Sequence, residues 1–80
     1  MKWIILVTYV LGNGDVFPTI ENSGEFPLVF DTVNQCQNML NPNDLYDLEI
    51  INGKVLATRR HSDGSKEVRL CQMINTEFFR

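Results

Sequence analysis

The sequence predicts an α+β domain in which an antiparallel sheet of four to five strands carries one helix on one face. Three dipeptides, Asn13-Gly14, Asn52-Gly53 and Asp63-Gly64, each lie between strand-like runs. Each pairs a residue that tolerates positive φ with glycine, as a two-residue type I′ hairpin turn requires. One segment after Asp31-Thr32 has helical spacing instead. The elements are therefore expected in the order β-β-α-β-β-β.

The chain is a single small domain that spans residues 1–80. A chain of this length buries only roughly 60–65% of its unfolded surface, so its core is small. Hydrophobic residues make up 44% and charged residues 21% of the sequence, which is typical of a globular protein and not of a disordered one. No segment reaches the ~20 apolar residues that a membrane-spanning helix needs.

Residues 2–11 form the first predicted strand. One lysine before a short apolar run is similar to a secretory signal, but no small residues mark a cleavage site, and the run holds Trp3, Thr8 and Tyr9. We therefore expect a strand of the mature protein, a cytoplasmic chain and two free thiols. Both faces of this strand are apolar, which predicts a place inside the sheet.

The second strand returns from the turn at Asn13-Gly14. Counting outward from a two-residue turn places Val10 opposite Phe17. Pro18 has no N–H to donate to a neighbouring strand, so residues 16–20 should lie at an edge of the sheet.

The helix is expected after a mobile connection over residues 21–27. Asp31 or Thr32 can cap its N-terminus, because a side-chain oxygen at that position accepts a free backbone N–H. Val33, Cys36 and Leu40 then follow the spacing of one apolar helix face, and Asn41-Pro42 ends the helix.

The last three strands form two hairpins around the second and third turn dipeptides. In the first, Leu48 faces Ala57; in the second, a two-residue turn places Arg60 opposite Glu67 and Ala57 opposite Leu70. In this register one surface carries Val55, Ala57, Val68 and Leu70.

One short helix cannot cover both faces of such a sheet. The apolar surface left uncovered should comprise Ile4, Leu6, Val10, Leu56, Cys71 and Met73. Contiguous apolar patches above a few hundred Å² usually mark an interface. The candidate contacts of a homo-oligomer are Ile4, Leu6, Val10 and Met73. Alternatively, this surface is covered by Phe26, Leu28, Phe30 or the Phe78-Phe79 tail.

Cys36 and Cys71 are expected to be free, buried thiols that pack as small hydrophobic groups. Cys36 points from the helix to the face of Ala57, whereas Cys71 alternates with Leu70 and points away. A one-residue bulge would reverse the direction of Cys71 and allow a disulfide, so a bridge stays open.

No constellation for catalysis, a metal or a cofactor is visible. His61, the single histidine, has no second histidine or suitably spaced cysteine with which to share zinc, and we expect it to be a solvated hairpin residue. The acidic run with Asp44, Asp47 and Glu49 lacks the glycine-bearing loop of a calcium site, and no phosphate-binding glycine motif occurs. We therefore expect no enzyme activity and no cofactor.

Charge is segregated along the chain. Residues 3–53 hold seven of the ten carboxylates and no Lys, Arg or His, and the formal net charge is −3. Charge that is segregated in this way influences which partners a protein attracts. The favoured function is a non-catalytic binding protein that meets another protein with a basic surface through Asp44, Asp47 and Glu49, while Leu56 adds an apolar contact.

Two other functions stay open. The chain could assemble with itself through the sheet as a structural subunit. Alternatively, the hairpin over residues 54–69 could contact nucleic acid through Arg59, Arg60, Lys66 and Arg69. A pI near 4.9 disfavours nucleic acid and anionic membranes as partners, and no aromatic residue between Arg59 and Arg69 could stack on bases.

Three features together resemble short proteins common in phage genomes: an apolar first strand, the helix start Phe30-Asp31-Thr32 leading to Cys36, and a late strand with Cys71. Small size and acidity are also similar to those of phage-encoded inhibitors that silence host enzymes or defence complexes by covering a basic surface. The resemblance implies an inhibitor of a host protein that acts in the host cytoplasm. It carries over no residue role.

Overall fold

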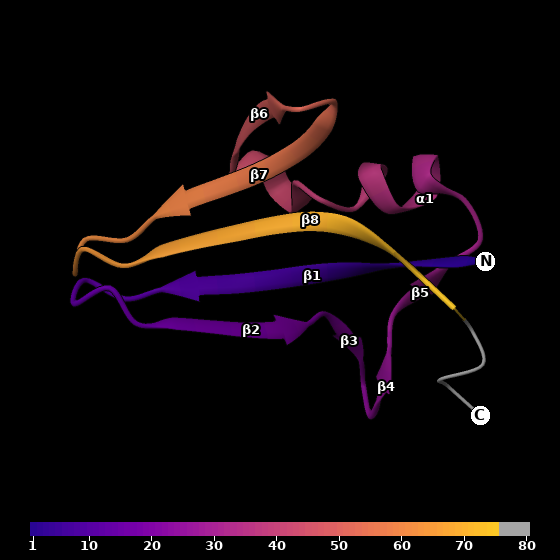
Figure 1. Ribbon diagram of the computed structural model, residues 1–80, viewed down its shortest axis with the longest axis horizontal. Coiled ribbons are helices and arrows are strands. Elements are labelled where there is room, and N and C mark those ends of the chain that lie inside the picture. The colour runs from indigo at the N-terminus through magenta and orange to yellow at the C-terminus, as the bar shows by residue number, and fades with distance from the viewer. Residues whose placement is uncertain (76–80) are drawn as a thin grey trace.

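The computed structural model describes residues 1–75, which form a twisted antiparallel sheet with a helix on one face (Figure 1). The long strands are β1 (Lys2–Val10), β2 (Val16–Ile20), β6 (Asp47–Ile51), β7 (Lys54–Arg60) and β8 (Lys66–Ile74). Their order is β2-β1-β8-β7-β6, and the short β5 (Val29–Phe30) pairs with the start of β1. The prediction of a mostly antiparallel sheet with a single α-helix is confirmed.

Two sequence features position the strands as predicted. β1, which is apolar on both faces, lies between β2 and β8 in the middle of the sheet. β2 is an edge strand and contains Pro18 opposite Thr8. The segment expected to be a mobile connection instead forms a separate small hairpin of β3 (Asn22–Ser23) and β4 (Phe26–Pro27).

The Asn52-Gly53 turn has the predicted two-residue form, because Asn52 and Gly53 adopt φ of 53° and 77° and Leu48 lies opposite Ala57. The third turn is one residue longer. His61 N donates to Ser65 O at 2.9 Å, Gly64 N donates to His61 O at 3.1 Å, and Gly64 has φ of 90°. This is a three-residue loop that ends in a glycine bulge.

The first turn has the same three-residue form, with Leu11 N donating to Asp15 O at 2.8 Å. The predicted registers of both hairpins are therefore wrong by one residue: Val10 lies opposite Val16 instead of Phe17. Arg60 lies opposite Lys66 instead of Glu67, and Ala57 lies opposite Arg69 instead of Leu70. In each loop an Asx side chain stabilises the longer form, since Asp63 Oδ1 accepts the N–H of Ser65 at 2.9 Å and Asn13 Oδ1 accepts that of Asp15 at 3.0 Å.

A shift of one residue moves every side chain of a strand to the other face. Glu67, Arg69 and Cys71 therefore lie on the side of the sheet that carries the helix, which we call the helix face. Val68 and Leu70 lie on the opposite side, the second face, so the predicted surface shared by Val55, Ala57, Val68 and Leu70 is wrong.

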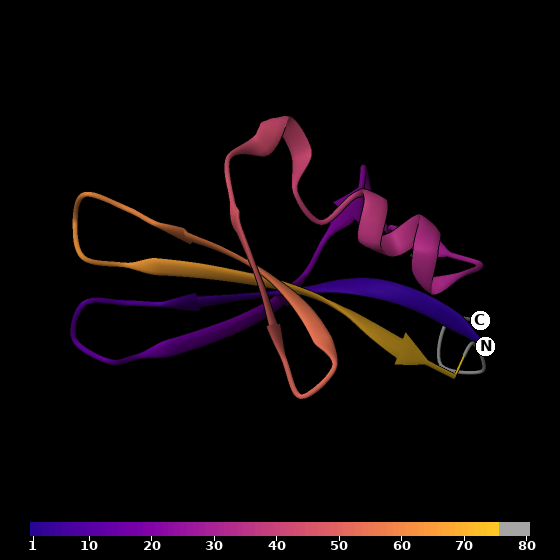
Figure 2. The same cartoon turned by 90° about the horizontal axis from the view of Figure 1, so that it is seen from above.

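The α-helix, α1 (Val33–Asn38), is shorter than the sequence spacing predicted. Thr32 is its N-cap, and its hydroxyl accepts the N–H of Gln35 at 3.2 Å. Cys36 and Leu40 are fully buried against a core that includes Ile5, Val7 and Ala57. A 3-10 helix, η1 (Pro42–Asp44), then leads to β6 and lies on the same side of the sheet as α1 (Figure 2).

Cys36 and Cys71 form a disulfide, so the expectation of two free thiols is wrong. Cys71 lies opposite Ile5 and faces the helix because of the longer loop before β8. The bridge joins a helix of six residues to a central strand. Lys2 adds a second link near the helix start by pairing with Asp31, and this lysine holds the pKa of the Asp31 carboxyl below its usual value.

The second face is only partly shielded by the described residues. Ile4 is 4% exposed, and Val29 of β5 lies opposite it. Phe30 packs on the core of the helix face, and Phe26 is exposed, so neither forms a broad cover. The Phe78-Phe79 tail lies outside the described residues.

Candidate functional site

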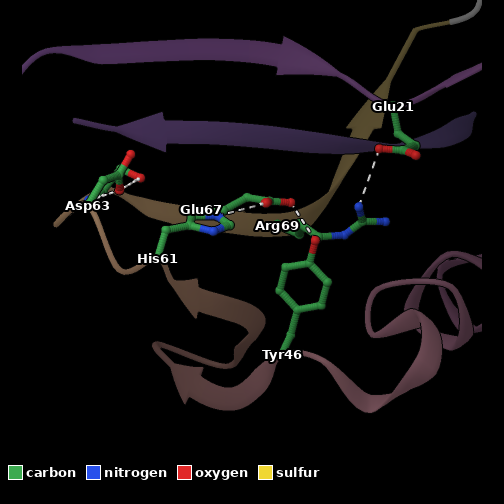
Figure 3. A network of polar contacts seen from close by, with 7 residues as sticks. Glu21, Tyr46, His61, Asp63, Glu67 and Arg69 are labelled. Atoms are coloured by element: carbon green, nitrogen blue, oxygen red, sulfur yellow. Dashed lines mark hydrogen bonds and ion pairs between the residues drawn. The ribbon is translucent and has the colours of Figure 1, made fainter.

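Two features of the described chain are candidates for function: a polar network on the helix face and the apolar second face. The network is centred on Glu67 and Arg69 of β8, which are only 7% and 6% exposed (Figure 3). α1 is short, so this part of the helix face is covered by Tyr46, in the segment between η1 and β6, and reached by Glu21, just after β2.

Glu67 joins a tyrosine and a histidine. Tyr46 Oη donates to Glu67 Oε2 at 2.5 Å, and His61 Nε2 lies 3.5 Å from Glu67 Oε1. Burial raises the pKa of Tyr46 above its usual value of 10.0, and the hydrogen bond to Glu67 raises it further. The network thus favours the neutral phenol as the donor to this buried carboxylate. His61, predicted to be a solvated hairpin residue, is half-buried beside it.

Arg69 connects three segments that are distant in the sequence. Its Nη1 lies 3.3 Å from Glu21 Oε2, and its Nη2 donates to the carbonyl of Met39 at 3.2 Å. Its guanidinium lies 5.3 Å from the centroid of the Tyr46 ring, which is within cation–π range. Among the described residues, its Nε is buried without a hydrogen-bond partner.

This network is suited to holding the fold together. A general acid or base must reach a substrate, but Glu67 and Arg69 are buried and paired with other members of the network. The two surface hollows described below are lined by other side chains. Within residues 1–75, no group of three or more His, Cys, Asp or Glu side chains is placed to hold a metal ion.

Sequence reasoning missed this network because it assigned Glu67 and Arg69 to the other face. Asp63 was the available signal, since an Asx side chain in a hairpin loop can select the longer bulged turn. With the longer loop, every second residue of β8 from Glu67 to Cys71 lies on the helix face, which includes Arg69.

The four residues proposed for nucleic acid are not brought together. Arg69 is buried and paired with Glu21, and Arg59 is half-buried opposite Glu67. Arg60 and Lys66 lie opposite each other on the second face. The described hairpin therefore presents one basic pair rather than a continuous basic stripe.

The second face carries two rows of side chains that run across the five long strands. The first row is Glu49, Leu56, Leu70, Leu6 and Ile20, each directly opposite the next. The second row is Asp47, Thr58, Val68, Thr8 and Pro18. We call the first row the apolar row. It has a carboxylate at the β6 end and four aliphatic side chains that are each half-buried.

The predicted partner-binding residues fall partly on this face. Asp47, Glu49 and Leu56 share it, and Glu49 lies directly opposite Leu56. Asp44 lies in η1, outside the sheet.

The predicted oligomer contacts are divided between the two faces. Leu6 and Val10 are half-buried on the second face, and Ile4 is buried there. Met73 lies opposite Trp3 on the helix face.

Two hollows on the described surface lie next to these features. One, of about 450 Å³, lies at the β2 end of the apolar row and is lined by Leu6, Pro18, Ile20 and Pro27 among others. The other, of about 300 Å³, lies beside the disulfide and includes Trp3, Val33, Val55 and Cys71 in its lining. The first hollow shares Leu6, Pro18 and Ile20 with the second face and so adjoins its apolar row.

These features define a small antiparallel β-domain whose short helix is anchored by a disulfide and whose second face carries an apolar row with carboxylates at its β6 end. Comparison of the chain with models of protein families found no match, and neither did comparisons with curated proteins and with solved structures. Across residues 1–75, no helix has the length and apolar character needed to cross a membrane.

Proposed function

We propose that this chain is a non-catalytic binding protein that uses its second face to hold another protein with a basic surface. The observation that carries the proposal is the apolar row, in which Glu49 borders four aliphatic side chains. Asp47 lies on the same face of β6 as Glu49, so the β6 end of this surface is acidic, whereas the basic pair of Arg60 and Lys66 lies on the same face beyond Thr58 and Val68.

The two parts of the surface have different physical roles. Exposed carboxylates attract a basic partner and raise the association rate, but exposed charge pairs add little lasting affinity. Removing half-buried aliphatic side chains such as Leu6 and Leu56 from water gives the durable contact. A partner that matches both parts has Lys or Arg beside an apolar patch.

The test is a native pull-down in which D47N/E49Q is compared with D15N/E25Q. Both double variants remove two negative charges, but Asp15 and Glu25 lie in loops and are not members of the apolar row. We expect D47N/E49Q to capture less partner and to lose most of the salt dependence, while D15N/E25Q behaves like the unmodified chain. Equal capture and equal salt dependence for the two variants would remove the electrostatic argument.

The sharper form of the proposal is a phage-encoded inhibitor that covers a basic surface of a host protein. Its support is the resemblance carried by the helix start at Phe30-Asp31-Thr32 and by Cys36 and Cys71. Neighbouring genes for capsid, nuclease or defence functions would each indicate a different process in which the protein acts. The captured host protein should lose activity when the chain is added in stoichiometric amount.

Self-assembly is the second candidate, because the apolar row could also be covered by another copy of the chain. Sedimentation at high and low protein concentration distinguishes the two functions. A dimer that dissociates on dilution and is weakened by Leu6→Ser would favour self-assembly, whereas a monomer at high concentration would count against it.

We place the protein in the cytoplasm of the cell in which it acts. Support comes from residues 2–10, which form a strand in the middle of the sheet. The Cys36–Cys71 bridge favours an oxidising compartment instead, and a thiol measurement described below separates the two.

A further inference from the structure

We infer that β6 is a strand-addition site, at which an extended segment of the partner pairs with the free edge of the sheet and presents Lys or Arg at alternate positions. This inference rests on the proposed function and deepens it by naming how the partner is held. It concerns the edge of the sheet, which is distinct from the apolar row that crosses the second face.

Within residues 1–75, no strand pairs with the outer edge of β6. β6 is the last strand in the order β2-β1-β8-β7-β6 and is seen at the outer margin of the sheet (Figure 1). A two-residue turn makes Ile51 and Lys54 a hydrogen-bonded pair, so Glu49 and Asp47 also exchange hydrogen bonds with β7. The N–H and C=O groups of the alternate residues, Leu48 and Ile50, then point away from β7.

The backbone N–H of Tyr46, two residues before Leu48, already has a hydrogen-bond acceptor. Tyr46 N donates to the side chain of Asn41 at 2.9 Å. An added strand can therefore pair only with the residues that follow Tyr46. Among these, Leu48 and Ile50 have the backbone N–H and C=O groups that point outward.

The side chains of this strand are suited to pairing with another chain. All five β6 residues are exposed, including Leu48 at 58% and Ile50 at 77%. An exposed edge strand with aliphatic residues is a ready template for an added strand. The opposite edge of the sheet differs, because β2 carries Pro18, which cannot donate a hydrogen bond.

Charge decides against a second copy as the occupant. Antiparallel pairing of β6 with itself that uses both outward residues places Leu48 opposite Ile50 of the copy and therefore Glu49 opposite Glu49, and like charges directly opposite are unfavourable. An added strand with Lys or Arg at every second position places these cations opposite Asp47 and Glu49. Its intervening apolar residues then lie opposite Leu48 and Ile50.

The experiment uses the full chain and a labelled ten-residue peptide in which Lys and Val alternate. The control peptide has the same composition with all Lys residues at one end. Fluorescence anisotropy measures affinity, and NMR hydrogen exchange reports the Leu48 and Ile50 amides. We expect the alternating peptide to bind at least tenfold more tightly and to slow exchange at both amides.

Two changes isolate the backbone contribution. Ile50→Pro removes the outward N–H and should weaken peptide binding at least tenfold, whereas Ile50→Val keeps it and should bind within twofold of the unmodified chain. Should Ile50→Pro fail to fold, methylation of the peptide backbone serves instead. N-methylation of the peptide residues whose backbone N–H groups point to β6 should abolish binding. N-methylation of the intervening residues, whose N–H groups point away from β6, should not.

Three other outcomes would each overturn one part of the inference or of the proposed function. Binding that ignores both proline and N-methylation, or that protects only the second face around Leu6 and Leu70, removes strand addition and leaves the proposed function intact. Protection of Leu48 and Ile50 in a dimer without peptide makes a second copy the occupant. Pull-down that is insensitive to D47N/E49Q, together with a peptide that binds at β6, removes the proposed basic-surface partner instead.

Discussion

Tyr46 donates a hydrogen bond to Glu67 over 2.5 Å and so joins the segment before β6 to the buried centre of β8. The two residues are 21 positions apart in the sequence. This contact gives a buried carboxylate a donor, and it places an aromatic ring under the guanidinium of Arg69. The stability of the helix face therefore depends on a polar pair as well as on apolar packing.

Tyr46→Phe should lower the free energy of unfolding by about 1–3 kcal/mol, because it leaves the buried Glu67 carboxylate without its tyrosine donor. Urea denaturation followed by circular dichroism measures the change. Tyr9→Phe is the matched control, since Tyr9 is exposed, and it should change the free energy by less than about 0.5 kcal/mol. Equal effects of the two variants would show that the hydrogen bond adds nothing.

Alkaline pH should destabilise the domain through Tyr46. Its folded pKa is raised above the usual value of 10.0, so above that pH the folded chain keeps a proton that the unfolded chain has lost. This contribution to stability is fully present below the unfolded pKa and is lost as the pH rises through the folded pKa. Unfolding free energies of the unmodified chain and Tyr46→Phe should therefore converge in strong alkali. A difference that stays constant across the alkaline range would contradict this assignment.

Loss of the disulfide should cost about 3–4 kcal/mol, as expected for a bridge that closes a loop with a sequence separation of 35. We expect Cys36→Ala/Cys71→Ala to unfold at lower urea concentration than the oxidised chain. A reductant should destabilise the unmodified chain to a similar extent and leave the double variant unaffected. Two free thiols in the purified, unreduced chain, detected by alkylation and mass spectrometry, would exclude the bridge.

Alkylation of thiols inside intact cells, before lysis, tests the proposed compartment. Cytoplasmic glutathione and thioredoxin keep most cysteine pairs reduced, so a cytoplasmic chain should be labelled at both Cys36 and Cys71. The bridge should then form after purification in air. A chain that is already bridged in the cell would contradict the cytoplasmic location.

Gly64→Ala should destabilise the domain by about 1–2 kcal/mol, because Gly64 has φ of 90° and a Cβ is unfavourable in that region. Gly12→Ala is the matched control in the neighbouring loop. Gly12 does not have a positive φ, and an added Cβ there would meet its nearest atom at 3.6 Å, an ordinary contact. Urea midpoints should therefore fall for Gly64→Ala and stay close to the original for Gly12→Ala; the reverse order would refute the bulged loop.

Several parts of the fold follow from local chemistry. Asn52-Gly53 forms the predicted two-residue turn, since both residues tolerate positive φ. Pro18 places β2 at an edge because proline lacks an N–H, and the helix begins at one of the two expected N-caps, Asp31 or Thr32, where the Thr32 hydroxyl accepts a free backbone N–H. Each of these outcomes depends on residues close together in the sequence, so the sequence alone was sufficient to predict them.

The face on which β8 places its side chains was decided by tertiary structure. Two-residue and three-residue loops are both compatible with Asp63-Gly64, and they differ by one residue in register. Because side chains alternate along a strand, that one residue determines whether Cys71 reaches Cys36 and whether Glu67 reaches Tyr46. The sequence by itself determined the five long strands, the place of the helix in the chain and the β2 edge. Long-range packing selected the register, and with it the disulfide, the buried polar network and the makeup of the second face.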